Sequence, residues 1–347
     1  MKNLKKIISI IAVVGLFIAF AIFGYIYYNA FTANTKFAEE EIYVYIPSNS
    51  NYEQASAILK PYIKDFNKFE FVANARKYNS NVKSGRFLLK KDMSNFDMIR
   101  ALRQNLPVQV AFNNQESIEK LVQRLSNQLE PDSLSLLIAF TNEPFLKQNN
   151  ISQETALTLF IPNTYEFFWN TSADKIAQKM AKEHQKFWSK ERLQKAQEQN
   201  LTQEQVYTLA SIIHKESVKA DERPKIAGVY LNRLKINMPL QADPTIIYAI
   251  KKEYNDFDRV IKRVLHSDLQ INSPYNTYKN TGLPPGPIAM PDVSAIDAVL
   301  NPEKHQYIYF CASPNRAGYH DFATSYAEHQ KNAKKYADWV NKLGINR

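Results

Sequence analysis

The sequence predicts an α+β protein with a single N-terminal transmembrane helix, a small α+β module and a larger, mostly helical domain with short strands. Three observations support this class. One long apolar segment opens the chain, short apolar runs bounded by turn residues indicate strands, and amphipathic segments with capping residues indicate helices. The chain of 347 residues is long enough for two modest domains with hydrophobic cores.

The composition excludes several other classes of protein. Apolar residues make up 45% and charged residues 22% of the chain, and the counts of 8 Gly and 16 Pro exclude collagenous and low-complexity chains. The single cysteine, Cys311, cannot form an internal disulfide, a cysteine zinc cluster or an iron–sulfur site. The net charge of +10 favours anionic partners such as cell wall polyanions, lipid head groups or nucleic acid.

The N-terminus predicts a membrane anchor. Residues 7–28 carry no charge, and this length crosses a hydrocarbon core of roughly 30 Å. A cleaved signal peptide is the alternative, but its apolar region is usually about 7–15 residues long, and the present one ends in an aromatic belt, Tyr25-Ile-Tyr-Tyr28. The basic residues 1–6 stay in the cytoplasm by the positive-inside rule. We therefore expect a single-pass protein of the bacterial cell membrane whose remaining residues lie outside the cytoplasm, which excludes nucleic acid as a partner.

Residues 29–39 form a polar tether, and residues 40–106 are predicted to form the small α+β module. Its strands are indicated by short apolar runs and its helices by apolar periodicity. Its last helix is marked by a Ser with an acidic residue at the capping-box position. The predicted elements are a strand at 42–46, helices at 52–64 and 67–78, a strand at 86–89 after the turn Ser84-Gly85, and a helix that begins at Ser94.

Residues 107–347 are predicted to form the larger domain. Its clearest helix begins at the capping box of Thr202 and Gln205. At 100° per residue, the apolar stripe of this helix runs through Leu209 and continues to Glu216. The other predicted elements are a strand at 108–112, a helix at 117–129, mostly helical structure over 130–200 with a break at 161–169, a helix at 222–235 and a helix capped by Asp243-Pro244.

Glu216 is the best candidate for a catalytic group. A carboxylic acid on an apolar helix face has a raised pKa, because desolvation disfavours its charged form. A general acid that works near neutral pH needs such a pKa. The alternative interpretation is a buried structural glutamate that pairs with a nearby base such as Arg223 or Arg233.

Other chemistries have weaker support in the sequence. The six histidines form no HExxH motif and no paired metal-ligand spacing, and the sequence contains neither a nucleophile elbow nor a nucleotide-binding glycine fingerprint, so we expect no metal and no cofactor. Asp243 is a candidate second carboxylate, although its place directly before Pro244 favours a helix N-cap. The segments Tyr275-Asn-Thr-Tyr278 and Gly282-Leu-Pro-Pro-Gly286 suit either sugar binding by aromatic and amide groups or ordinary packing.

Six motifs follow one another in the second half of the chain. They are Leu209-Ala-Ser-Ile-Ile-His-Lys-Glu-Ser217, Glu222-Arg223, Val229-Tyr-Leu-Asn-Arg-Leu234, Leu240-Gln-Ala-Asp-Pro-Thr245, Tyr275-Asn-Thr-Tyr278 and Thr281-Gly-Leu-Pro-Pro-Gly286. In this order they resemble the endolytic murein transglycosylase family (MltG-like, YceG-like). The resemblance extends over nearly the whole ectodomain and includes the membrane anchor. It also includes the segments Ile161-Pro-Asn-Thr-Tyr165, His320-x-Phe322 and Glu328-His329.

The resemblance implies a membrane-bound peptidoglycan lytic transglycosylase, a lyase of cell wall biogenesis. Such an enzyme cuts glycan strands between N-acetylmuramic acid and N-acetylglucosamine, leaves 1,6-anhydro ends, and would terminate the elongation of nascent strands. The resemblance places the catalytic role on Glu216 and makes residues 40–106 a LysM-like module. It also implies peptidoglycan synthases (penicillin-binding proteins) as partners. The residues that it implies for substrate binding are Ser217, Gln241, Asp243, Tyr275, Asn276 and Tyr278.

The chain departs from the family pattern at two positions. His214 and Asn163 occupy positions that are commonly acidic in the family. Neither change removes a required functional group. We expect His214, two residues before Glu216, to affect the pH profile.

Two other functions remain open at this point. A non-catalytic peptidoglycan-binding membrane tether would use the LysM-like module and the aromatic loop, while Glu216 only satisfies a buried base. A glycoside hydrolase would produce reducing ends and would need a second carboxylate at roughly 5–5.5 Å or 6.5–9.5 Å from the first. Identification of the sugar end released from purified sacculi separates the three functions.

The anchor prediction is tested by sequencing the N-terminus of the mature protein. We expect residues 7–28 to remain attached, because the apolar run is longer than a signal peptide requires and lacks a small-x-small cleavage site. A mature chain that begins beyond residue 25 would show that the segment is a cleaved signal.

Overall fold

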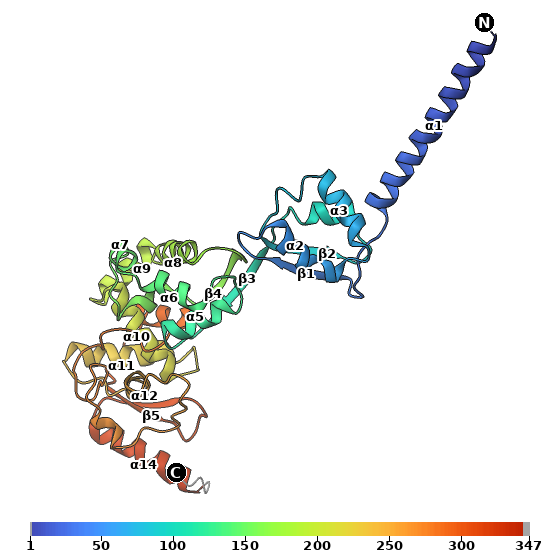
Figure 1. Ribbon diagram of the computed structural model, residues 1–347. Helices are drawn as coiled ribbons and strands as arrows, with labels where there is room; N and C mark the ends of the chain where they lie inside the picture. Colours follow the sequence, from blue (N-terminus) through green and yellow to red (C-terminus); the bar gives the residue numbers. More distant parts are fainter. Residues whose placement is uncertain (1, 343–347) are drawn as a thin grey trace. The chain divides into compact units, whose positions relative to one another are not determined.

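The computed structural model of the chain describes residues 2–342, and Figure 1 shows its course. About half of the chain is α-helical, and the strands of the described residues form three two-stranded sheets, so the predicted mixed class is confirmed. The chain divides into two compact units, residues 1–109 with 166–171 and residues 110–165 with 172–347. Met1 and residues 343–347, at the ends of the predicted tail and larger domain, lie outside the described residues.

The first helix, α1 (Lys2–Phe31), is the dark blue helix of Figure 1. Within its segment Leu4–Phe31, a stretch of 18 residues has a mean hydropathy of 2.9. The rest of the described chain does not bury this stretch. The large apolar side chains along it, such as Phe17 and Phe20, are exposed. The predicted apolar helix is therefore present, and by length and composition it can cross a membrane.

The last turn of α1 is held by the folded part of the first unit. Asn95 donates from Nδ2 to the backbone oxygen of Asn29 at 2.7 Å and accepts a hydrogen bond from Nδ2 of Asn34 at 2.8 Å. The ring of Phe31 stacks on that of Phe96, with 5.2 Å between centroids. Asn95 is fully buried, so water cannot replace these hydrogen bonds if they are lost.

The rest of the first unit is a two-stranded antiparallel sheet with helices around one core. The register runs from Glu41 opposite Lys90 to Ile46 opposite Gly85. Gly85 has a φ of +137°, and a Cβ there would meet the side chain of Asn105. The elements are β1 (Glu41–Ile46), α2 (Tyr52–Leu59), η1 (Lys60–Tyr62), α3 (Phe66–Ala75), β2 (Gly85–Lys90) and α4 (Asn95–Ala101).

The predicted elements of this unit are present, but the helices predicted over residues 52–64 and 67–78 end earlier, at Leu59 and Ala75. Ser94 is the N-cap of α4, and its hydroxyl accepts a hydrogen bond from the backbone N of Asp97. The helix predicted over residues 52–64 ends at Leu59 and continues as a 3₁₀ turn that contains Pro61. Proline restricts the residue before it and has no N–H to donate, so the α-helix ends there.

The second unit is mostly helical. The division between the units falls within β3 (Pro107–Phe112) and β4 (Asn163–Phe168), which pair with each other, and β4 lies in the break that the sequence predicts. The remaining elements are α5 (Ile118–Ser126), α6 (Ser133–Thr141), α7 (Glu143–Gln148), η2 (Ala156–Leu159), α8 (Ala173–Phe187), α9 (Lys190–Glu198), α10 (Gln203–Glu216), α11 (Arg223–Lys235), α12 (Asp243–Glu253), η3 (Asp268–Gln270), α13 (Val293–Leu300), β5 (Tyr309–Ala312), β6 (His320–Ala323) and α14 (Tyr326–Lys342).

The helix α10 is the core element of this unit. The capping box of Thr202 and Gln205 is confirmed. Every residue from Val206 to Ile213 is buried, because α9, α11, α12 and α13 all pack against this helix. The sequence predicts a single apolar stripe, whereas the middle of the helix is covered all round, as is typical of a core helix. The first and last turns of α10 leave the core, and Glu216 is the final residue of the last turn.

The role of Asn95 can be tested by replacing it with Ala. The substitution leaves the oxygen of Asn29 and the amide of Asn34 without their buried partner, and we expect it to lower the free energy of opening of the first unit by about 2 kcal/mol. Hydrogen exchange of β1 and β2 amides in the full chain in detergent measures this value. The matched control is the exposed Asn74→Ala on α3, which should change exchange little. Equal exchange in both variants would contradict the proposed role of Asn95.

Candidate active site

Glu216 is a partly buried carboxyl with a single direct side-chain partner. Its Oε1 accepts a hydrogen bond of 2.7 Å from the hydroxyl of Tyr230 on α11. Burial raises the pKa of Glu216 to about 7, against the opposing effect of the Tyr230 hydrogen bond. The positive charge of His320 lowers this pKa and the negative charge of Asp243 raises it, each by a smaller amount. Near neutral pH the group therefore exists in both protonation states, as an acid–base catalyst requires.

The corner between α10 and α11 is held by buried hydrogen bonds. Ser217 follows Glu216 as the C-cap of α10 and is buried, and its hydroxyl donates to Oε2 of Glu222 at 3.4 Å. The backbone oxygen of Ser217 accepts a bond of 3.1 Å from Nε of Arg223. Ser217 therefore fixes the direction in which the chain leaves Glu216, and its buried hydroxyl faces the protein.

His320 on β6 is attached to the same corner through Glu222. The backbone N of His320 donates to Oε1 of Glu222 at 2.8 Å, and its Nδ1 lies 2.8 Å from Oε2. Glu222 is buried, so both carboxylate oxygens are satisfied by this pairing and by Ser217. The C-terminal hairpin is thereby fixed close enough to Glu216 for the charge of His320 to act on it.

The two arginines that could pair with Glu216 have other partners. Arg223 forms an ion pair with Asp292, with 3.2 Å between NH1 and Oδ2. The buried Arg233 donates to the backbone oxygens of Ile308 at 2.6 Å and Leu240 at 2.7 Å. Among the described residues, no ion pair involves Glu216. Glu216 therefore does not form the ion pair with Arg223 or Arg233 that the structural interpretation proposed.

Asp243 lies close enough to affect Glu216 but does not cap its helix. The N-cap of α12 is Ala242, which makes no side-chain cap, and Asp243 is the first helical residue. The predicted N-cap role of Asp243 is therefore wrong, because the helix begins one residue earlier than that role requires. Asp243 is exposed, and its Oδ1 accepts a bond of 2.5 Å from the hydroxyl of Tyr278. Burial raises the pKa of the Tyr278 hydroxyl, and the hydrogen bond to Asp243 and the charges of Asp243 and Glu216 raise it further, so Asp243 and Tyr278 form a polar pair beside Glu216.

Gln241 precedes this pair in a strained backbone conformation. Its φ is +47°, which is uncommon for a residue other than glycine. The backbone N of Gln241 donates to the oxygen of Thr277 at 3.1 Å, and that of Ala242 donates to the hydroxyl of the same residue at 3.0 Å. This pairing attaches the start of α12 to the 275–278 loop. The side chain of Gln241 is exposed, so it is available to a ligand.

Tyr275 and Asn276 are placed below the surface. Tyr275 is 2% exposed and its ring contacts Tyr248, with 4.7 Å between centroids. Asn276 is 0% exposed and donates to the oxygens of Leu269 at 3.0 Å and Ile271 at 2.8 Å. Its Oδ1 accepts from the backbone N of Tyr278.

The expectation that Tyr275 and Asn276 contact substrate directly stays a prediction from the family resemblance. Both side chains are buried, although Tyr275 lines a cavity of about 380 Å³. Asn276 instead satisfies buried backbone groups and shapes the loop, which presents Tyr278 to Asp243. Aromatic and amide residues in a loop cannot be assigned to binding or to packing by sequence, because both roles use the same residue types.

His214 faces a different set of side chains. Its Nδ1 lies 3.3 Å from Oδ2 of Asp292, which also accepts from Arg223. Burial lowers the pKa of His214, with the nearby Asp292 acting in the opposite direction. His214 therefore belongs to a cluster that joins α10, α11 and the start of α13.

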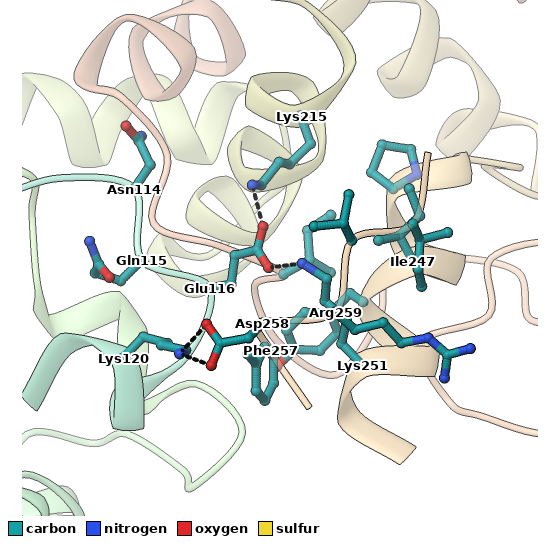
Figure 2. A pocket seen from close by; sticks show the side chains of 15 residues that line it. Asn114, Gln115, Glu116, Lys120, Lys215, Ile247, Lys251, Phe257, Asp258 and Arg259 are labelled. Atoms are coloured by element: carbon teal, nitrogen blue, oxygen red, sulfur yellow. Dashed lines mark hydrogen bonds and ion pairs between the residues drawn. The ribbon is translucent and has the colours of Figure 1, made fainter. Parts of the chain in front are cut away.

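A cavity of about 540 Å³ lies on the neighbouring face of the second unit. Figure 2 shows Glu116 between two lysines, Lys215 of α10 and Lys251 of α12, each with Nζ at 2.6 Å from a carboxylate oxygen. Lys215 directly precedes Glu216, but Glu216 does not itself line this cavity. Among the described residues, no group of three or more His, Cys, Asp or Glu could hold a metal ion.

Several site residues have no recognisable local signal in the sequence. Tyr230 reads as one more apolar residue on the buried face of α11, yet its hydroxyl is the direct partner of Glu216. Glu222 and His320 are 98 residues apart in the chain and meet only through folding. Their place in the motifs that resemble a family is the one signal that marks them.

Comparison with known proteins identifies a family and several relatives. The YceG-like family matches residues 44–335. A protein named endolytic murein transglycosylase from Bacillus subtilis (strain 168) is 31% identical over 327 residues, which is 88% of each chain. A protein with the same name from Streptococcus pneumoniae serotype 2 (strain D39) is 28% identical over 367 aligned positions, covering 96% of this chain and 65% of its own length.

A solved structure also resembles the chain. The crystal structure of a yceG-like protein from Listeria monocytogenes matches with a TM-score of 0.56 and 28% identity, covering 85% of this chain and 99% of that one. The family match covers more than half of the present chain, and the Bacillus relative is matched over most of both sequences. The chain therefore belongs to the YceG-like family.

Proposed function

We propose that this protein is a membrane-anchored endolytic peptidoglycan lytic transglycosylase and that Glu216 is its catalytic acid and base. The relatives named endolytic murein transglycosylase support the general function. The observation that carries the catalytic assignment is the partly buried Glu216 carboxyl, whose pKa is raised by burial to about 7 and whose direct partner is the Tyr230 hydroxyl. A non-catalytic tether would have no use for an acid kept protonated near neutral pH.

The reaction assigned to Glu216 transfers one proton in each of two steps. The protonated carboxyl gives its proton to the oxygen between C1 of N-acetylmuramic acid and C4 of N-acetylglucosamine, and the C1–O bond breaks. The carboxylate then takes the proton of the muramic acid 6-hydroxyl while that oxygen bonds to C1. The products are a 1,6-anhydro end and a free 4-hydroxyl, and Glu216 is again protonated.

This chemistry needs only one carboxyl on the enzyme. The nucleophile belongs to the substrate, and an oriented intramolecular hydroxyl can reach effective molarities of order 10⁵ M or more. Tyr230 engages Oε1 and thereby leaves Oε2 of Glu216 for the substrate proton. Asp243, Gln241 and Tyr278 present polar groups beside this carboxyl and would bind sugar hydroxyl or N-acetyl groups.

The organisation of the chain supports the remaining parts of the proposal. The exposed apolar α1 would anchor the protein in the cell membrane, with the basic residues 1–6 in the cytoplasm and the catalytic region, within residues 107–347, outside. Residues 40–106 have their own core and a β–α–α–β order, and they would serve as a LysM-like glycan-binding module. Termination of nascent strands and association with peptidoglycan synthases remain predictions from the family resemblance.

The catalytic assignment predicts opposite effects of Glu216→Gln on activity and stability. The variant keeps the shape and an acceptor for Tyr230 but cannot donate the proton, so activity should fall by at least about 10²-fold. The raised pKa means that the folded state holds this proton more tightly than the unfolded state, so wild-type stability declines as the pH rises from about 4.5 to about 7. At pH 8 the variant should therefore be more stable, by at most about 3 kcal/mol.

Two measurements check this prediction. Mass spectrometry of digested sacculi should find anhydro ends with the wild type and few with Glu216→Gln, and denaturant unfolding at pH 8 gives the stability difference. The control is Glu253→Gln at the exposed end of α12, which should change neither value. Reducing ends would favour a hydrolase, and a less stable Glu216→Gln protein would favour a structural glutamate.

The neighbours of Glu216 predict the direction in which the pH profile moves. Because the free enzyme must be protonated at Glu216, kcat/KM should fall as the pH rises above about 7. Asp243→Asn removes a charge that raises this pKa, so the alkaline limb should shift to lower pH while most activity is retained. Tyr230→Phe removes a hydrogen bond that lowers the pKa of Glu216, so the fall of kcat/KM on the alkaline side should shift to higher pH. Unchanged limbs in both variants would reject Glu216 as the titrating group.

A further inference from the structure

The cavity of Figure 2 combines an apolar floor with a cationic rim. Several segments of the second unit line it, including the loop before α5, the end of α10, one face of α12 and the loop that follows α12. Its volume of about 540 Å³ lies in the range of small-ligand sites. The apolar part is formed by Pro244, Ile247, Phe257, Val260 and Ile288. The charged groups are Lys120, Lys215, Lys251 and Arg259, against Glu116 and Asp258.

The cations of the rim are held in place by the two carboxylates. Lys215 and Lys251 each donate to one oxygen of Glu116, and Lys120 donates to both oxygens of Asp258 at 2.6 Å. Burial opposes ionisation of Glu116, yet the two lysines outweigh it and hold its pKa below the usual value. An ammonium group has three donors, and Lys215 and Lys251 each use one on Glu116. The pair can therefore still receive an anionic group.

The cavity begins beside the catalytic carboxyl. Lys215 is the residue before Glu216, and Pro244 is the residue after Asp243. Consecutive Cα atoms are about 3.8 Å apart, so both borders of the cavity lie one residue from the polar cluster around Glu216. This adjacency in the chain is the basis for placing a substituent of a sugar bound at Glu216 in the cavity.

We propose that this cavity binds the peptide carried by the lactyl group of N-acetylmuramic acid, and that Lys215 and Lys251 receive a carboxylate of that peptide. The inference rests on the proposed function, since it concerns the substrate of the same enzyme. The peptide is attached to the sugar whose C1 reacts at Glu216. Its alkyl groups match the floor of Ile247 and Ile288, and its free carboxylates match the lysines.

The test compares two substrates that differ only in the peptide. One is glycan strands that carry their peptides, and the other is the same strands after an amidase has removed them. The stripped strands keep the lactyl carboxylate, so the comparison reports on the peptide and not on negative charge in general. Soluble, uncrosslinked strands give kcat and KM for each.

Lys251→Met removes one cation of the pair and keeps the length of the side chain. A hydrogen bond to a charged group is worth enough that its loss should raise KM for peptide-bearing strands by about tenfold, with kcat unchanged. KM for stripped strands should not change. The matched control is Lys252→Met, the next residue of α12, which loses the same charge but does not line this cavity.

Glu116→Gln gives an effect of opposite sign. It removes the internal carboxylate that occupies the two lysines, so a ligand carboxylate meets less competition. KM for peptide-bearing strands should fall several-fold and KM for stripped strands should stay the same. Equal changes of KM for both substrates would place the glycan in the cavity instead of the peptide. An unchanged KM in both variants would also overturn the proposal.

A binding measurement separates failure of this inference from failure of the proposed function. Calorimetry with a soluble disaccharide-peptide and the Glu216→Gln protein needs no turnover. The proposal expects binding that Lys251→Met weakens and Lys252→Met does not. If the wild type forms no anhydro ends from either strand substrate while this binding pattern holds, the proposed reaction is wrong and the peptide site stands. Binding that is equal in all variants overturns the peptide site.

Discussion

The proposed chemistry of this protein depends on the desolvation of one carboxyl at the end of a helix whose middle is fully packed. The burial of Val206–Ile213 fixes α10 in the core of the second unit, and the helix ends at Glu216, where the chain turns away. Burial raises the pKa of this group to about 7, and the hydroxyl of Tyr230 prevents a larger rise by stabilising the charged form. The balance keeps both protonation states accessible, which neither a solvated nor a fully enclosed carboxyl would allow.

The surroundings of Glu216 are assembled from distant parts of the chain. Glu222 attaches the hairpin that contains His320, and Arg223 attaches the start of α13 through Asp292. These pairs leave Glu216 without an ionic partner among the described residues. An arginine paired with Glu216 would lower its pKa and remove the proton that the reaction needs. The structural pairs therefore protect the protonation equilibrium of the site.

Two sets of polar and charged residues adjoin each other in the second unit, one around Glu216 and one in the neighbouring cavity. Around Glu216 the groups are a tyrosine, an exposed aspartate and an amide, which suit neutral sugar groups. On the other side of Lys215 the groups are lysines held by Glu116, which suit an anion. Successive side chains of an α-helix point in directions about 100° apart, so Lys215 and Glu216 lie on different faces of α10.

The sequence alone determined the elements whose signals are local. The apolar first helix, the capping box of Thr202 and the strands at residues 42–46 and 86–89 each follow from neighbouring residues, and the motif order identified the family. Tertiary structure alone decided the rest. Asp243 does not cap α12, Tyr275 and Asn276 are buried, and Tyr230 is the partner of Glu216. Caps and periodicity act over a few residues, whereas burial and hydrogen-bond partners depend on which distant segments pack together, and no local pattern encodes that choice.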